Sequence, residues 1–184
     1  VDSVTYSGTD GVLTNNGDGT HTFEPNENFN GQVHLEFGVS DGTSVTSANI
    51  DISVADINDA PIAGYTSYTV DEDGQITISP EQLLANSTDV DGEVSLVSVG
   101  YSCIYGILTT NENGSVTFSP NENFHGEIRL EVLIMDDDGD LAATYAGLTT
   151  VAVNDVPVVD GTLAYSVDED GSITLSQEQL LANA

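Results

Sequence analysis

The chain has 184 residues, of which 39% are hydrophobic, enough for one large domain or about two small ones with their own cores. Arg129 is its only basic residue against 31 Asp and Glu, so its formal net charge is −30. Such a surface repels nucleic acid and anionic membranes, which excludes both as expected partners. Cys103 is the single cysteine, which rules out an intrachain disulfide and a thiolate metal site, and we interpret it as a small buried strand residue.

Three motifs recur along the chain at nearly the same spacing. "PNENFNG" at 25–31 returns as "PNENFHG" at 120–126, and "NDAP" at 58–61 returns as "NDVP" at 154–157. "VDEDG" at 70–74 returns unchanged at 167–171. A unit of about 96 residues is too long for a solenoid repeat and is typical of a small β-sandwich domain.

The Asn-Asp-x-Pro segments are the natural boundaries between units. They predict that residues 1–59 are the C-terminal part of one repeat, 60–155 a complete repeat, and 156–184 the N-terminal part of a further repeat. The sequence then starts inside a repeat, so the lack of a visible leader carries little information. The two end pieces are complementary in their content, since each holds most of what the other lacks.

Taken in chain order, the predicted elements are mostly strands. Two hairpins with Asn-Gly or Asp-Gly turns are predicted at 12–23 and 107–118. Alternating apolar residues predict half-buried strands at 32–39 and 127–134. Their inward positions would be Val33, Leu35, Phe37 and Val39 in the first and Ile128, Leu130, Val132 and Ile134 in the second.

A single helical signal lies in "SPEQLLAN" at 79–86. Ser79 is placed as N-cap, Pro80 as the first helical residue and Gln82 as the partner that closes a capping box. About seven strands per unit, with turns every 8–12 residues and one short helix, predict an immunoglobulin-like β-sandwich.

Acidic and amide residues concentrate in a few loops, and two interpretations are open. Asp, Asn and Gly form turns in any β protein, which explains each loop taken singly. However, an end-to-end sandwich brings all of these loops to one pole or the other, where converging carboxylates are costly unless a cation binds. Ca²⁺ prefers such oxygen-only ligands, whereas the spacing fits neither an EF-hand nor a glycine-rich calcium nonapeptide array.

The order of these motifs resembles the calcium-binding motif order of cadherins. A Glu ends the first strand, an Asp-x-Asp follows, then come an acidic loop, an acidic last hairpin and the linker "DINDAP". More closely, "VDEDGSITLS", "NGDGTHTFEPNENFNG" and "VNDVP" resemble the tandem cadherin-like repeats of giant bacterial RTX adhesins. The resemblance implies an all-β fold of tandem cadherin/Ig-like repeats, bound Ca²⁺, and an extracellular place at a bacterial cell surface after type I secretion.

The resemblance also implies two calcium-binding junctions and the residues at each. The expected ligands of the first junction are Glu27, Asp56, Asn58, Asp59, Asp89, Asp91, and one or more of Asp136, Asp137 and Asp138. Those of the second junction are Asp71, Glu72, Asp73, Glu122, Asn154 and Asp155. Glu169 is the copy of Glu72 in the further repeat and is expected to serve there.

The pattern bears on three possible functions. Carboxylate pairs could serve glycoside hydrolysis, but they lie in loops at the ends of the repeats rather than in a cleft. No nucleophile–base motif is visible, so we do not expect an enzyme. The interpretation that we favour is a calcium-stiffened spacer of a surface adhesin, with neighbouring repeats of the same protein as partners. A sugar- or peptide-binding sandwich is the alternative, and head-to-tail completion of the split repeats, between or within chains, is a further hypothesis.

Overall fold

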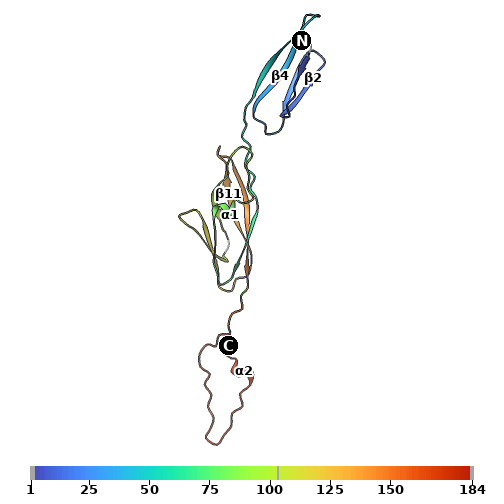
Figure 1. Cartoon of the computed structure of the whole chain (residues 1–184). Helices are drawn as coiled ribbons and strands as arrows, with labels where there is room; N and C mark the ends of the chain where they lie inside the picture. Colours follow the sequence, from blue (N-terminus) through green and yellow to red (C-terminus); the bar gives the residue numbers. More distant parts are fainter. Residues whose placement is uncertain (1–2, 103, 183–184) are drawn as a thin grey trace.

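The computed structural model describes residues 3–102 and 104–182, so the prediction for Cys103 lies outside the described residues. The chain runs through three parts along one axis, which we call the N-terminal part (residues 3–59), the middle part (60–155) and the C-terminal part (156–182) (Figure 1). The strands are β1 (Ser3–Thr5), β2 (Gly11–Asn15), β3 (His21–Pro25), β4 (Gly31–Ser40), β5 (Val45–Val54), β6 (Thr66–Asp71), β7 (Ile76–Ile78), β8 (Ser95–Gly100), β9 (Gly106–Thr110), β10 (Val116–Pro120), β11 (Gly126–Met135) and β12 (Leu141–Val151). The helices are α1 (Pro80–Leu83) and α2 (Gln177–Leu180), and neither is long or apolar enough to cross a membrane.

The middle part is a sandwich of seven strands, as the repeat length predicts. One sheet has the order β7-β10-β9 and the other the order β6-β12-β11-β8. Most pairs are antiparallel, but β6 lies parallel to β12, with Val70 opposite Thr150. This parallel pair brings the first strand of the unit beside the last, so the chain enters at one pole and leaves at the other.

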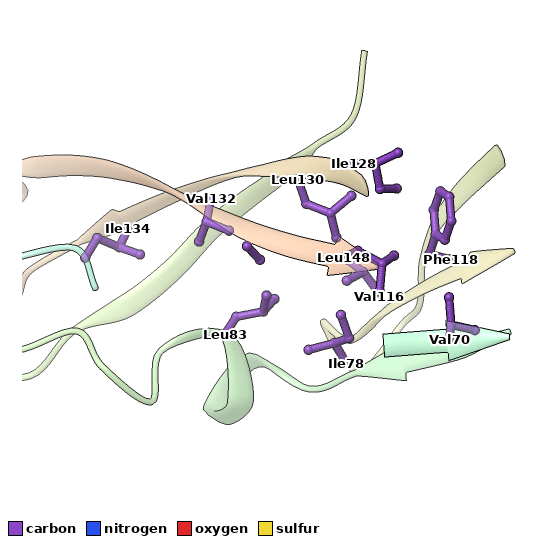
Figure 2. Packing of buried hydrophobic residues seen from close by; sticks show 11 residues of the cluster. Val70, Ile78, Leu83, Val116, Phe118, Ile128, Leu130, Val132, Ile134 and Leu148 are labelled. Carbon is purple, nitrogen blue, oxygen red and sulfur yellow. The ribbon is translucent and has the colours of Figure 1, made fainter. Parts of the chain in front are cut away.

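The alternation in β11 produces the core of the middle part. Leu130 and Ile134 are fully buried, and Ile128 and Val132 are nearly so, which confirms the predicted inward face. Figure 2 shows these side chains in one cluster with Phe118 from β10 and Leu148 from β12. Burial of such side chains is the main favourable term that holds the two sheets together.

Helix α1 begins where the sequence predicts. The Ser79 side chain accepts a hydrogen bond from the Gln82 N–H at 3.3 Å, and the Gln82 side chain accepts one from the Ser79 N–H at 2.9 Å. The predicted capping box is therefore confirmed. It fixes a single turn of helix that places Leu83, with no exposed surface, against the core (Figure 2).

The N-terminal part repeats the second half of this architecture. Its sheets have the orders β1-β4-β5 and β2-β3, and both predicted hairpins of the chain are confirmed. Gly17 and Gly19 adopt positive φ in the β2–β3 turn, as Gly114 does between β9 and β10. One predicted core position is wrong: Val39 is 47% exposed, because no described element covers that end of β4.

The C-terminal part, the expected beginning of a further repeat, is mostly irregular among its described residues. Residues 156–176 contain no strand in the structure, and only helix α2 and a turn at Gly171 are formed. A strand requires a neighbour for its backbone hydrogen bonds, and no described strand lies beside this segment. The helix forms nevertheless, because its Ser176–Gln179 capping box is local.

Candidate functional site

The upper junction, where the N-terminal part meets the middle part, joins three polar segments. They are the linker at 56–61, the loop at 88–93 and the β11–β12 turn at 136–140. The Asn58 side chain donates from Nδ2 to Asp136 Oδ2 at 3.1 Å and to Asp140 Oδ2 at 3.0 Å. The Asp59 backbone N–H donates to Asp91 Oδ2 at 2.7 Å. The linker is therefore hydrogen-bonded to both loops.

Both loops at this junction are built around one aspartate. Asp89 Oδ1 accepts the N–H groups of Asp91 and Gly92, each at 2.8 Å. Asp136 Oδ1 likewise accepts three successive N–H groups of its own turn, at 2.7–3.0 Å. These are the local bonds by which aspartates form turns, so Oδ1 of each carboxylate has a turn-forming role. The other oxygen, Oδ2, takes no part in these turn bonds.

The second oxygens differ in their surroundings. Asp136 Oδ2 accepts from Asn58, whereas Asp89 Oδ2 is buried and has no hydrogen-bond partner. The Asn58 amide is the largest cause that lowers the pKa of Asp136, and the turn's backbone N–H groups lower it further against the opposing effect of burial. Asp136 is therefore ionised at neutral pH although it is 3% exposed.

The remaining predicted ligands of the upper junction lie around this centre. The carboxylate of Asp137 lies close to the loop at 88–93. A Cβ atom added to Gly92 in that loop would lie 3.1 Å from Asp137 Oδ2. Asp56 accepts a hydrogen bond from Asn30 Nδ2 at 2.6 Å. Glu27 and Asp138 are exposed. The structure thus brings Asn58 into contact with Asp136 and Asp59 into contact with Asp91.

The lower junction, where the middle part leads into the C-terminal part, centres on Glu72. This side chain is 5% exposed, and its Oε1 accepts the Val153 N–H at 2.7 Å. Its backbone N–H donates to the Val151 carbonyl at 2.9 Å, which extends the β6–β12 pairing by one residue. The other oxygen, Oε2, is buried without a hydrogen-bond partner, and His125 Nδ1 lies 3.9 Å away.

Two further acids share a hollow with Glu72. Asp73 and Glu122 line the same open hollow, which is also bordered by Gly74 and Ser119. The carbonyl of Asp71 accepts the Gly74 N–H at 2.9 Å and closes the turn of the first "VDEDG".

The side chains of the other predicted residues of this region do not line the hollow. Asp71, Asn154 and Asp155 are exposed, and Asn154 donates only to the Asp155 carbonyl at 3.0 Å. Glu169, in the C-terminal part, is exposed as well. The structure therefore unites Glu72, Asp73 and Glu122 and leaves the remaining members at the rim.

These two junctions differ from a preformed metal cluster. Among residues 3–102 and 104–182, no three His, Cys, Asp or Glu side chains converge closely enough to form one. What the junctions offer is one buried carboxylate oxygen each, Asp89 Oδ2 above and Glu72 Oε2 below, without a bond from the protein. Such an atom is costly unless a donor or a cation reaches it. The acids nearby supply carboxylate oxygens, a chemistry that fits Ca²⁺, and the ring nitrogen of His125 lies 3.9 Å from Glu72 Oε2.

Three residues at the junctions escaped the sequence analysis. Asp140 shares Asn58 with Asp136, and Asn30 binds Asp56. His125 lies beside Glu72 and is the counterpart of Asn30 in the repeat, 95 positions further along. Asp140 could have been found from the acidic run of the last hairpin. The other two depend on packing between loops, which no spacing rule predicts.

Comparisons with known proteins agree with the fold. The family model described as a cadherin-like domain matches residues 1–55 and 57–151. No curated protein is similar enough in sequence to count as a match. Similar solved structures include protocadherin gamma B7 extracellular cadherin domains 1–4, at 16% identity over 92% of this chain and 47% of that one, with a TM-score of 0.46.

Other similar structures are the human desmocollin-1 ectodomain and an endo-fucoidan hydrolase, MfFcnA4 from glycoside hydrolase family 107. The first has 10% identity over 85% of this chain and 35% of that one, with a TM-score of 0.44. The second has 17% identity over 83% and 24%, with a TM-score of 0.34. The chain spans less than half of each of these structures. The two matched segments cover most of its 184 residues, and the chain therefore belongs to the cadherin-like domain family.

Proposed function

We propose that the chain is a calcium-stiffened spacer of an extracellular adhesin, in which bound Ca²⁺ fixes successive repeats end to end. The two orphaned carboxylate oxygens carry this proposal. Glu72 Oε2 and Asp89 Oδ2 are buried at the opposite poles of the middle part, beside the segments that lead out of it and into it. A purely turn-forming acid would have no reason to bury an oxygen without a partner.

The proposal assigns the ion at each junction to the acidic and amide residues of its loops. At the upper junction we expect Asp89, Asp91, Asp136 and Asp137 with Asn58 and Asp59 of the linker. Asp56 and Asp138 lie in the same segments, and Glu27 lies in the loop between β3 and β4. At the lower junction they are Glu72, Asp73 and Glu122, with Asp71, Asn154 and Asp155 at the rim and Glu169 at the matching place of the further repeat. Bound Ca²⁺ would supply the positive charge that these carboxylates lack.

The charge of the chain explains why the ion would stiffen it. Arg129 is the only Lys or Arg against 31 acids, so the protein has almost no fixed positive charge with which to neutralise its junctions. Without a cation, the acids of each junction repel one another, and hydrogen bonds such as those of Asn58 and Asp59 hold the upper linker against this repulsion. With Ca²⁺, the same acids become shared ligands of one centre.

The likeness of "VDEDG" and "NDVP" to the repeats of giant bacterial RTX adhesins gives the proposal its setting. In that setting the protein is extracellular, reaches the bacterial surface by type I secretion, and holds distal adhesive domains away from the cell in adhesion and biofilm formation. Neighbouring repeats are its partners, and it has no catalytic role. Extracellular modules of this kind bind Ca²⁺ at about 10⁻⁴–10⁻³ M.

Thermal unfolding with and without calcium tests the proposal. Scanning calorimetry in EDTA, in 10 mM Ca²⁺ and in 10 mM Mg²⁺ should show a transition that Ca²⁺ raises well beyond the effect of Mg²⁺. Titration calorimetry on the same samples should show a saturable Ca²⁺ heat. A shift of less than about 2 °C together with no heat of binding would reject the proposal, since a ligand that binds the folded state must stabilise it.

One observation supports a second candidate, a sugar-binding face on the middle part. A hollow over β6, β12 and β11 is lined by Tyr65, Tyr105 and Tyr145, with Glu127 beside them. The guanidinium of Arg129 lies 6.0 Å from the ring centre of Tyr145. Exposed aromatic rings with a few polar groups suit a sugar ring. A glycan array in calcium buffer tests this candidate, and binding that Tyr145→Ala abolishes would establish it.

A further inference from the structure

The hollow lined by Tyr65, Tyr105 and Tyr145, which we call the tyrosine hollow, contains Arg129, the only Lys or Arg of the chain. Its volume is about 530 Å³, within the range usual for sites that bind small molecules. It lies on the outer face of the sheet β6-β12-β11-β8 and shares no lining residue with either junction. The tyrosine hollow is therefore a surface of the middle part that the calcium proposal does not use.

Arg129 lacks the acid with which its counterpart in the N-terminal part is paired. On β4 and β5, His34 lies opposite Asp51, and His34 Nδ1 is 2.6 Å from Asp51 Oδ1. On β11 and β12, Arg129 holds the place of His34 and lies opposite Gly147. Within the described part of the chain, no carboxylate oxygen lies within ion-pair distance of the Arg129 guanidinium. Its N–H groups are therefore not taken up by an acid of the protein.

Gly147 also makes room for Tyr65. A Cβ atom added to Gly147 would collide with the hydroxyl group of Tyr65, so the end of this side chain lies against the backbone of β12. A glycine at this position thus leaves Arg129 without a cross-strand acid and lets Tyr65 border the hollow. An aspartate there, like Asp51 in the N-terminal part, would remove both features.

The lining of the hollow differs between the repeats, whereas the junction motifs are nearly copies. Tyr145 stands at the register position of Asn49. Tyr105 stands at the place of Asp10, since the backbone N–H of each donates to the hydroxyl of a tyrosine four residues earlier. By contrast, "PNENF" occurs unchanged in both repeats. Copied loops suit a repeated structural task, and a face that is built differently in one repeat suits a contact of its own.

The three rings of the hollow are exposed but held in place. Tyr65, Tyr105 and Tyr145 are 57%, 45% and 47% exposed. The Tyr105 ring is stacked on Phe124, with ring centres 4.6 Å apart and 12° between the planes, and the guanidinium of Arg129 lies over the Tyr145 ring. Rings that are fixed before binding offer apolar contact at little cost in entropy. A flat apolar surface, such as the C–H face of a sugar ring, suits them.

The position of the hollow disfavours an extended peptide as its ligand. Its floor is formed by β11 and β12, which lie between β6 and β8 in the sheet order. A peptide strand adds at the edge of a sheet, so these inner strands give it no place. A ligand must therefore be held by side chains. The polar side chains that line the hollow besides the tyrosines are Ser67, Ser102, Glu127, Arg129, Glu131 and Thr149.

The charges of the hollow favour an uncharged ligand. Glu127 and Glu131 flank Arg129 on the same face of β11, because side chains alternate along a strand with a period of two. Two carboxylates against one guanidinium leave a net charge of −1, on a chain whose formal charge is −30. An anionic ligand therefore meets repulsion, and a cationic one must approach the guanidinium. The hydroxyl groups of a neutral sugar can accept from Arg129 and donate to a carboxylate.

We propose that the tyrosine hollow binds an uncharged sugar unit of a glycan. The sugar ring packs on the tyrosines, and its neighbouring hydroxyl groups accept from Arg129 and donate to Glu127 or Glu131. This inference rests on the sugar-binding candidate given above and adds the class of sugar that the hollow takes. It does not depend on the calcium proposal.

A glycan array in 150 mM NaCl tests the class of sugar, since charges beyond about 8 Å are screened at this ionic strength and the hollow itself decides the preference. The array carries neutral oligosaccharides of glucose, galactose and mannose, and oligosaccharides of uronic acids, each both as the free acid and as the methyl ester. Binding is scored as the difference between the wild type and Gly147→Asp, so that contacts elsewhere on the chain cancel. The wild type should bind neutral or esterified sugars, and each free acid at least roughly tenfold more weakly than its ester.

Titration calorimetry with the strongest array ligand then tests the residues. Gly147→Asp should lower the affinity by roughly tenfold or more, because the new acid pairs with Arg129 and displaces Tyr65. Tyr145→Ala and Arg129→Gln should each lower it by roughly tenfold through loss of a ring contact or of charged donors. Asp51→Gly, the reverse change in the N-terminal part, is the matched control and should leave the affinity unchanged.

The remaining outcomes separate this inference from the candidate on which it rests. Thermal unfolding checks that Gly147→Asp keeps its fold, and Tyr145→Ala, an exposed substitution, gives an independent answer if it does not. Thr109→Asp adds the same charge to an exposed position of the other sheet and should bind like the wild type. Equal or stronger binding of the free acids would overturn the inference and leave a sugar-binding face standing. Binding to no sugar, or binding that both hollow variants leave unchanged, would reject the two together.

Discussion

Glu72→Gln separates the two explanations for the buried acid at the lower junction. The substitution keeps an oxygen that can accept the Val153 N–H bond, now 2.7 Å long, and removes one charge from a side chain that is 5% exposed. In EDTA, the variant should be as stable as the wild type or slightly more so, because the orphaned carboxylate oxygen is replaced by a neutral group near Asp73 and Glu122. In calcium, it should lose the stabilisation that the ion supplies.

The expected magnitude follows from the linkage between binding and folding. If Ca²⁺ binds with a dissociation constant of about 10⁻⁴ M, then 10 mM Ca²⁺ stabilises the folded middle part by about 2.7 kcal/mol. That corresponds to a rise of roughly 10 to 20 °C for a domain of this size. A 100-fold loss of affinity in Glu72→Gln would leave about 0.4 kcal/mol, so most of the calcium-dependent rise should vanish.

Scanning calorimetry in EDTA and in 10 mM Ca²⁺ measures the shift, and hydrogen exchange of β11 and β12 assigns the transition to the middle part. Glu112→Gln is the matched control, because Glu112 is an exposed acid at the tip of the β9–β10 hairpin. The control should keep the full calcium-dependent rise. If Glu72→Gln keeps it too, Glu72 is not a ligand and the reasoning about its orphaned oxygen is refuted.

Three further predictions concern the upper junction, the core and the helix cap. Asn58→Ala removes both amide bonds from the linker to the β11–β12 turn, so small-angle scattering in EDTA should show a broader distribution of interatomic distances than for the wild type; an unchanged distribution would mean that these bonds do not hold the joint. Leu83→Ala should lower the free energy of unfolding of the middle part by about 2–5 kcal/mol in urea titrations, because Leu83 has no exposed surface. Leu180, the matching residue of the C-terminal part, is 53% exposed, so Leu180→Ala should change the same free energy by less than about 0.5 kcal/mol. Ser79→Ala should cost about 1 kcal/mol through loss of the capping box, and Ser176→Ala should leave the same transition unchanged; equal effects of the two would contradict the assignment of the transition to the middle part.

Local patterns in the sequence predict most of the middle part. The alternation around Leu130 identifies the buried face of β11, because the side-chain period of a strand is two and only one face meets the core. Ser79 and Gln82 identify the helix start, because both partners of a capping box lie within four residues. These features need no knowledge of distant contacts.

The failures arise where a structure depends on a distant neighbour. Val167 and Ile173 repeat the pattern of β6 and β7 but form no strand, since β6 requires β12 and β7 requires β10 beside it. Val39 has the right phase in β4 but lacks cover. In both cases the residue type suits a strand, but a neighbouring element decides whether the strand forms or the side chain is buried.

The candidate sites show the same division. The order of the acidic motifs predicts that Asn58 meets the last hairpin, and the structure places Asn58 on Asp136. It could not indicate that Asp140 shares that amide, nor that His125 would lie beside Glu72. Which oxygen of a carboxylate serves a turn and which remains free is decided by loop packing, and that detail is what makes Glu72 and Asp89 the informative acids.

The most direct test of calcium stiffening is small-angle X-ray scattering of the chain in EDTA and in 10 mM Ca²⁺. The account predicts that Ca²⁺ lengthens the maximum dimension and narrows the distance distribution, because the junctions change from mutually repelling acids to shared ligands. Mg²⁺ at the same concentration should have a smaller effect, since it prefers fewer protein ligands. Superimposable scattering curves in EDTA and Ca²⁺ would contradict the claim that calcium stiffens this chain.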